Sequence, residues 1–93
     1  MRVHVLVRGR VQGVGFRWYV REAARTLGLA GWVRNRPDGT VEVAAQGDGE
    51  VLERLRDMLR AGPNGATVTA VDDVHENEQS EYDDLARPFT ILR

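Results

Sequence analysis

The sequence predicts an α+β fold in which two helices cover one face of an antiparallel or mixed sheet. Four stretches show the apolar–polar alternation of β-strands, and two others carry apolar residues at helical spacing. Their order is βαββαβ, with a short extra strand at the C-terminus, which is that of the split βαβ or ferredoxin-like sandwich. Because 93 residues leave no room for a second core, we expect a single domain over residues 1–93.

The first half of the chain predicts a strand, a helix and a hairpin. Residues 3–7 alternate as a strand, and residues 17–27 follow as a helix that Gly28 ends. The buried face of this helix is predicted to consist of Phe16, Val20, Ala23, Ala24 and Leu27. Residues 30–36 and 40–46 alternate again, and the Pro37-Asp38-Gly39 sequence between them predicts a turn that makes the two strands an antiparallel hairpin.

A second helix is predicted after this hairpin. Asp48 is a good N-cap residue, and Gly62-Pro63 ends the helical pattern. The apolar stripe of this helix is predicted to consist of Val51, Leu55, Met58 and Leu59.

The last third of the chain predicts two weaker strands. Residues 66–74 alternate as a fourth strand, and Phe89 and Ile91 indicate a short closing strand. Residues 72–84 hold seven acidic residues and no Arg, so we expect a solvated strand end and loop there.

The composition narrows the class of protein. Apolar residues make up 42% and charged residues 29%, as in ordinary globular proteins. No stretch approaches the ~20 apolar residues that cross a bilayer, and the N-terminus lacks the basic and apolar regions of a secretory leader. Cysteine is absent, which excludes disulfides, thiolate metal sites and cysteine nucleophiles and favours a cytoplasmic location.

Charge is distributed unevenly although the net charge is only −1. Residues 1–36 carry eight Arg and one acidic residue, a net +7, whereas residues 37–93 carry five Arg and thirteen acidic residues, a net −8. All thirteen basic residues are Arg, whose planar guanidinium suits phosphate and carboxylate. A GC-rich genome would also favour Arg over Lys, but it would not place the positive charge in the first third of the chain.

A glycine-rich segment between the first strand and the first helix is the strongest chemical signal. Gly9, Gly13 and Gly15 allow backbone conformations in which several N–H groups face one anion at a helix N-terminus. The segment is neither a Walker loop nor a dinucleotide fingerprint, so it predicts a cradle for one phosphate with Arg17 beside it. The alternative is a tight crossover with Arg17 in solvent. In the predicted topology, Asn35 lies at the same edge of the sheet as this loop.

These residues resemble the acylphosphatase family. The sequence GRVQGVGFR at residues 9–17 is similar to its first signature. The second signature resembles GWVRN at residues 31–35 followed by Gly39, Val41 and Gly47, and the family's final strand is similar to FTILR at residues 89–93. The resemblance implies a ferredoxin-like fold and metal-free hydrolysis of the carboxyl–phosphate bond of acyl phosphates. It also implies that Arg17 binds the phosphate and that Asn35 orients the attacking water. The lack of Lys and the acidic stretch depart from the family but lie outside these motifs.

The residue types suit this chemistry, because phosphoryl transfer asks a protein mainly to position groups and neutralise charge. We expect the phosphate-binding set to be Arg17 together with the backbone N–H groups of Val11, Gln12, Gly13, Val14, Gly15 and Phe16. The amide of Asn35 can both accept from and donate to a water. The leaving carboxylate has a conjugate acid of pKa about 4, so no general acid, metal or cofactor is expected.

Two other functions remain open at this level. An RNA-binding module shares this topology and would suit a basic N-terminal third, but the predicted central strands lack the stacking aromatics that it needs. A non-catalytic acyl-phosphate-binding module, as in hydrogenase-maturation carbamoyltransferases, would carry the same signatures. The sequence itself favours acyl phosphate and inorganic phosphate as partners of a monomer, with no nucleic acid and no membrane.

Other polar and aromatic residues have simpler interpretations. His4 is expected on the surface, and Asp38 is expected to form a turn. Trp18 or Tyr19 could border the pocket, although plain packing is the simpler role. Trp32 is expected to be a core or half-buried strand residue, with a place in the wall of the pocket near Asn35 as the alternative.

Two further groups of charged residues have simple interpretations. The first is a set of possible metal ligands whose spacing fits no known metal site, so a solvated loop is expected. It consists of Asp72, Asp73, His75, Glu76 and Glu78. The second group comprises the arginines of the predicted strands, Arg8, Arg10, Arg34 and Arg36, which we call the strand arginines. They either attract anions toward the pocket or are simply solvated.

Overall fold

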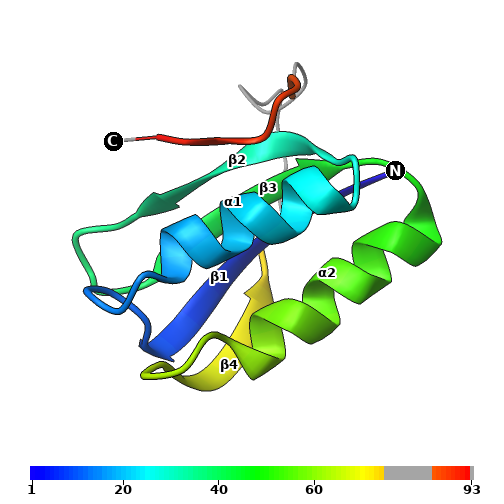
Figure 1. Cartoon of the computed structure of the whole chain (residues 1–93). Coiled ribbons are helices and arrows are strands. Elements are labelled where there is room, and N and C mark those ends of the chain that lie inside the picture. The colour runs from blue at the N-terminus through cyan, green and yellow to red at the C-terminus, as the bar shows by residue number, and fades with distance from the viewer. Residues whose placement is uncertain (75–84, 93) are drawn as a thin grey trace.

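The computed structural model of the chain describes residues 1–74 and 85–92. Its elements are β1 (Arg2–Arg10), α1 (Phe16–Thr26), β2 (Ala30–Asn35), β3 (Val41–Gln46), α2 (Gly49–Ala61), β4 (Thr67–Asp73) and β5 (Thr90–Ile91). Figure 1 shows both helices on the same face of the sheet, with the C-terminal strand alongside β2. The predicted βαββαβ order with a short closing strand is confirmed.

Within the described residues the sheet has five strands, in the order β4-β1-β3-β2-β5. β3 lies between β1 and β2 and is antiparallel to both, so β1 and β2 run parallel to each other. β5 adds to the outer edge of β2 in parallel. The C-terminal ends of β1 and β2 therefore reach the same edge of the sheet, as the predicted topology requires.

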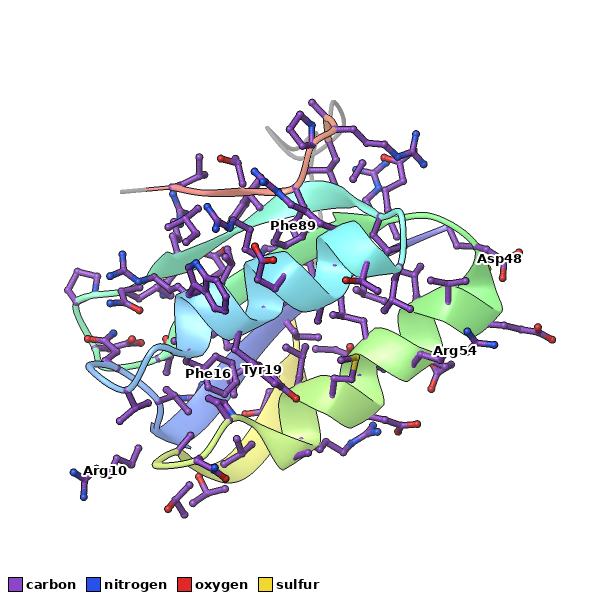
Figure 2. The ribbon with its side chains drawn as sticks, viewed as in Figure 1. Arg10, Phe16, Tyr19, Asp48, Arg54 and Phe89 are labelled. Carbon is purple, nitrogen blue, oxygen red and sulfur yellow. The ribbon has the colours of Figure 1, made fainter. Side chains whose placement is uncertain are left out.

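The core lies between the sheet and the two helices. The odd-numbered valines of β1 and β3 face the helices, as the alternation predicts, and Val33 of β2 does the same. From the helices, the fully buried side chains include Phe16, Val20, Leu52, Leu55 and Leu59. Figure 2 shows Phe16 and Tyr19 projecting from α1 on the side of α2.

The two helices begin in different ways. Asp48 caps α2 as predicted, because its side chain accepts a hydrogen bond of 2.9 Å from the N–H of Glu50. The buried stripe of α2 differs from the prediction in that Leu52 is buried, while Val51 and Met58 are only partly buried. Gly15 precedes α1 in a left-handed conformation, and no side chain of the described residues caps that helix.

The expectation that His4 lies on the surface is wrong. Its side chain is only 8% exposed on the sheet face opposite the helices, where its Nε2 lies 2.5 Å from Oε2 of Glu42. The ring of Trp32 covers it edge-on, with the two ring centroids 6.1 Å apart. The outer face at the centre of the sheet is therefore covered by its own side chains, which simple alternation does not reveal.

Part of the acidic segment lies within the described chain. Asp72 and Asp73 belong to β4 and form ion pairs with Arg8 and Arg56 respectively. The remainder, residues 75–84, lies outside the described residues, as do three members of the metal-ligand set considered above, His75, Glu76 and Glu78.

We expect Gly31→Ala to destabilise the fold more than Gly39→Ala. Both glycines have positive φ, 137° and 93°, so each substitution strains the backbone by about 1–2 kcal/mol. Only at Gly31 would the new methyl group also overlap a backbone atom, the carbonyl oxygen of Ala44 on β3. Urea unfolding should show a loss of about 1–2 kcal/mol for Gly39→Ala and of about 4 kcal/mol or more for Gly31→Ala. Equal losses would contradict the close approach of β2 and β3.

Candidate active site

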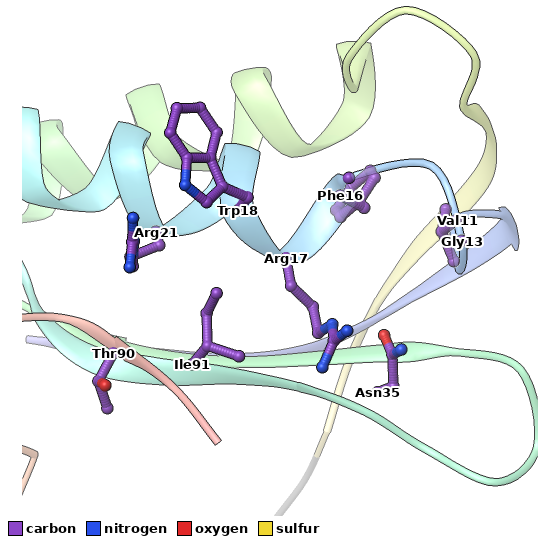
Figure 3. A pocket seen from close by; sticks show the side chains of 10 residues that line it. Val11, Gly13, Phe16, Arg17, Trp18, Arg21, Asn35, Thr90 and Ile91 are labelled. Carbon is purple, nitrogen blue, oxygen red and sulfur yellow. The ribbon is translucent and has the colours of Figure 1, made fainter. Parts of the chain in front are cut away.

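A pocket of about 390 Å³ lies where α1 begins, between the loop after β1 and the end of β2 (Figure 3). Its lining comprises Val11, Gly13, Gly15, Phe16, Arg17, Trp18, Arg21, Asn35, Thr90 and Ile91. One half of it combines loop backbone with Arg17 and Asn35. The other half extends along α1 toward β5. None of these lining residues is Asp, Glu or His.

The loop between β1 and α1 lines this pocket with residues that include Gly13 and Gly15. Gly13 and Gly15 adopt left-handed conformations with φ of 76° and 78°, and a Cβ on either would meet no atom within 4 Å. The first N–H groups of a helix lack intrahelical acceptors, and no described side chain caps α1. These donors, at the positive end of the helix dipole, are therefore available to an anion.

Arg17 is the cation of this half of the pocket. It lies in the first turn of α1 and is half-buried. Within residues 1–74 and 85–92, no hydrogen bond or ion pair engages its guanidinium. Figure 3 shows the side chain extending from α1 toward Asn35. A charged fork with five N–H donors and no protein acceptor is suited to grip a phosphoryl group at two oxygens.

Asn35 is the last residue of β2 and faces the helices, on the same side of the strand as Val33. Its side-chain Oδ1 is buried and has no hydrogen-bond partner among the described residues. A buried acceptor without a partner costs about 1–3 kcal/mol. This oxygen is thus placed to accept a hydrogen bond from a ligand or a water in the pocket.

Gln12 ties the loop to the hairpin that carries Asn35. Its Nε2 donates to the carbonyl oxygens of Arg36 at 2.8 Å and of Thr40 at 2.9 Å. The sequence pointed only to its backbone N–H, and the bridging role of its side chain was missed. An amide with two donors close to a tight turn is the signal that could have suggested it.

Asp38 stabilises the turn between β2 and β3, as predicted. The carboxylate of Asp38 accepts from the hydroxyl of Thr40 at 2.7 Å and from the Thr40 N–H at 3.0 Å. These hydrogen bonds, the hydroxyl first, hold the pKa of Asp38 below its ordinary value. Asp38 is therefore a turn former, and it does not line the pocket.

The structure brings most of the predicted site residues together. Gln12 and Val14 are the two loop residues that do not line the pocket. Trp18 does border the pocket and is 58% exposed, whereas Tyr19 donates to the carbonyl of Met58 and packs between the helices. The far half contains three residues that the sequence did not suggest, Arg21, Thr90 and Ile91.

The strand arginines do not line the pocket. Arg8 pairs with Asp72, and Arg34 and Arg36 pair with Glu42 on the opposite face of the sheet. Trp32 is half-buried, as expected, but on that same outer face, where the guanidinium of Arg34 stacks 4.9 Å from its ring centroid.

Comparison with known proteins identifies the family. The acylphosphatase family model matches residues 3–91. The chain is 46% identical to the acylphosphatase of Chlorobaculum tepidum over 91 residues, which cover 98% of this chain and 95% of that one. The chain belongs to the acylphosphatase family. It is an acylphosphatase, a hydrolase that acts on acyl phosphates and yields inorganic phosphate, as the signatures predicted.

Solved structures agree with this assignment. The crystal structure of the acylphosphatase from Bacillus subtilis superposes with a TM-score of 0.86 at 35% identity, covering 99% of this chain and 98% of that one. The structure of T. kodakarensis HypF also matches, with a TM-score of 0.79 and 28% identity, but the match covers only 12% of that longer chain. The likeness to stand-alone acylphosphatases therefore extends over nearly their whole length.

Proposed function

We propose that this acylphosphatase hydrolyses its substrate by in-line attack of a water held by Asn35 on a phosphoryl group held by Arg17 and the loop. The observation that carries the proposal is the buried, unpartnered Oδ1 of Asn35 opposite an unpaired guanidinium. Neither group has a protein partner in the described chain, and both border one pocket.

Phosphate binding is assigned to the half of the pocket with the open N–H groups. The phosphoryl oxygens accept hydrogen bonds from the loop backbone at residues 11–16 and a two-pronged contact from Arg17. These donors keep their positions while charge shifts from the phosphoryl group to the leaving oxygen, so they stabilise the transition state without rearrangement.

The water is assigned to Asn35. Its Oδ1 accepts a hydrogen bond from one O–H of the water and thereby aims an oxygen lone pair at phosphorus. As the new P–O bond forms, the P–O bond to the carboxylate breaks, and both protons of the water stay on the phosphate product. Asn is a weak base, but the loose transition state of phosphoryl transfer needs little deprotonation of the nucleophile. The departing carboxylate needs no proton, because its conjugate acid has a pKa of about 4.

The acyl group is assigned to the far half of the pocket. That half combines the apolar surface of Trp18 and Ile91 with the polar groups of Arg21 and Thr90 (Figure 3). A phosphoryl group alone would leave this space unused.

The remaining expectations belong to the same proposal. The chain acts as one domain over residues 1–93, as a monomer in the cytoplasm, without a cofactor and without nucleic acid as a partner. Among the described residues, Met1 and Trp18 are the large apolar side chains that are exposed, which supports the monomer. No helix within residues 1–74 and 85–92 is long and apolar enough to cross a bilayer.

Arg17→Lys should bind inorganic phosphate much more weakly than the wild type, although it retains a positive charge. Lysine cannot reproduce the planar fork, so the two-pronged contact is lost. A hydrogen bond to a charged group is worth about 1.5–3 kcal/mol, or roughly tenfold and more in Kd. Phosphate inhibition of acetyl phosphate hydrolysis gives the affinity. Arg54→Lys, on the exposed side of α2, is the matched control and should behave as wild type. Wild-type phosphate affinity in Arg17→Lys would contradict the assignment.

Asn35→Ala should lower kcat by roughly a hundredfold while changing the inhibition constant of phosphate by less than about twofold. The asymmetry arises because Asn35 contacts the water and not the phosphoryl group. Asn64→Ala replaces an exposed asparagine in the loop before β4 and serves as the control. A parallel fall of kcat and phosphate affinity would mean that Asn35 supports the loop instead.

The rate of acyl phosphate hydrolysis should be unaffected by EDTA and nearly level from about pH 5 to 8. No titratable base lines the described pocket, and the leaving carboxylate requires neither an acid nor a metal. The measurement is kcat/KM for benzoyl phosphate across this range, with and without chelator. A bell-shaped profile, or inactivation by EDTA, would reveal a group that the mechanism lacks.

A further inference from the structure

Glu42 is a charged residue that the pocket does not explain. It lies in the middle of β3 on the sheet face opposite the helices, and it is only 1% exposed. A buried carboxylate is unfavourable unless it is paired and hydrogen-bonded. Here Nε of Arg34 lies 2.7 Å and Nη1 of Arg36 lies 3.1 Å from Oε1, and His4 binds Oε2.

These contacts keep Glu42 ionised. Burial, the largest single influence, raises the pKa of Glu42, but the hydrogen bonds from His4, Arg34 and Arg36 outweigh it and bring the pKa below its ordinary value. A carboxylate that stays charged holds both guanidinium groups on the outer face at neutral pH.

The two arginines bound by Glu42 flank Asn35 in the sequence. Successive side chains of a strand point to opposite faces, so fixing residues 34 and 36 on the outer face directs residue 35 toward the helices and the pocket. Arg34 is also the register partner of Glu42, and Asn35 is that of Val41. Because Oδ1 of Asn35 has no hydrogen-bond partner in the described chain, its orientation depends on how firmly this backbone is held.

Arg36 also connects this clamp to the phosphate-binding loop. Its side chain binds Glu42, while its carbonyl oxygen accepts from Nε2 of Gln12. A continuous set of contacts therefore runs from Glu42 through Arg36 and Gln12 to the loop on the other side of the pocket.

We propose that Glu42 is a positioning residue of this acylphosphatase, which acts through Arg34 and Arg36 to hold Asn35 in line with the phosphoryl group. The inference rests on the proposed function, because it assumes that Asn35 orients the water. Glu42 lies on the opposite face of the sheet from the pocket, so it contacts neither the substrate nor the attacking water.

The test is a double-mutant cycle between Glu42→Gln and Asn35→Ala. Glu42→Gln retains the size of the side chain but removes its charge, and kcat for acetyl phosphate should fall by about tenfold. The inhibition constant of phosphate should change by less than about twofold. In the Asn35→Ala background, the same substitution should leave kcat within about twofold, because the group that it positions is gone.

Asp72→Asn is the matched control. Asp72 also carries a carboxylate on the outer face, ion-paired with Arg8 at 2.7 Å, but this pair is about half exposed and remote from Asn35. Its kcat should equal that of the wild type. Thermal unfolding of each variant establishes that the kinetics refer to folded protein.

An unchanged kcat in Glu42→Gln, or an equal loss in both backgrounds, would overturn the inference, because a merely structural effect does not depend on Asn35. If Asn35→Ala itself kept full activity, the proposed role of Asn35 would fail instead, so the two failures are distinguishable. Should Glu42→Gln not fold, Arg36→Gln provides the same cycle. It removes one contact of Glu42, together with the longer ion pair of 4.0 Å between Arg36 and Asp38, and leaves Glu42 bound to His4 and Arg34.

Discussion

The active site depends on one constraint of the sheet, the placement of β3 between two parallel strands. β1 and β2 then end at the same edge, two strand spacings or about 9–10 Å apart. The loop after β1 turns into α1 across this gap, and Asn35 ends β2 on its other side. The topology itself therefore sets the width of the pocket in which the proposed phosphoryl group and water would lie.

The two faces of the sheet carry different kinds of side chain. On the face toward the helices, valines pack against the helices, and Asn35 at the end of β2 is a polar residue that lines the pocket. On the other side, Glu42 gathers cationic side chains at the centre of the sheet. Ionic contacts are thereby kept apart from the pocket, where an additional carboxylate would repel the substrate phosphate. The backbone of β2 connects the two faces.

Local patterns were sufficient to predict the fold. They also placed Arg17 and Asn35 at one pocket, while the roles expected of these two residues stay predictions. Alternation, helical spacing and turn glycines identified every element, and the shared edge of β1 and β2 placed Arg17 near Asn35. Interactions between distant side chains were beyond that reasoning. His4 and Glu42 are 38 residues apart and meet only through strand register, and the bridge from Gln12 to the hairpin likewise requires the folded turn. The far half of the pocket was missed because β5 brings Thr90 and Ile91 beside α1 from the end of the chain.

The uncapped start of α1 has a consequence for the empty enzyme. Serine and aspartate are the usual caps at this position, but the φ of 78° at Gly15 is strained for any residue other than glycine. In the proposed mechanism the phosphoryl group accepts from these amides, so bound phosphate would take the place of a side-chain cap. Occupancy and folding are then thermodynamically linked, so the protein is more resistant to heat while it holds product than after release.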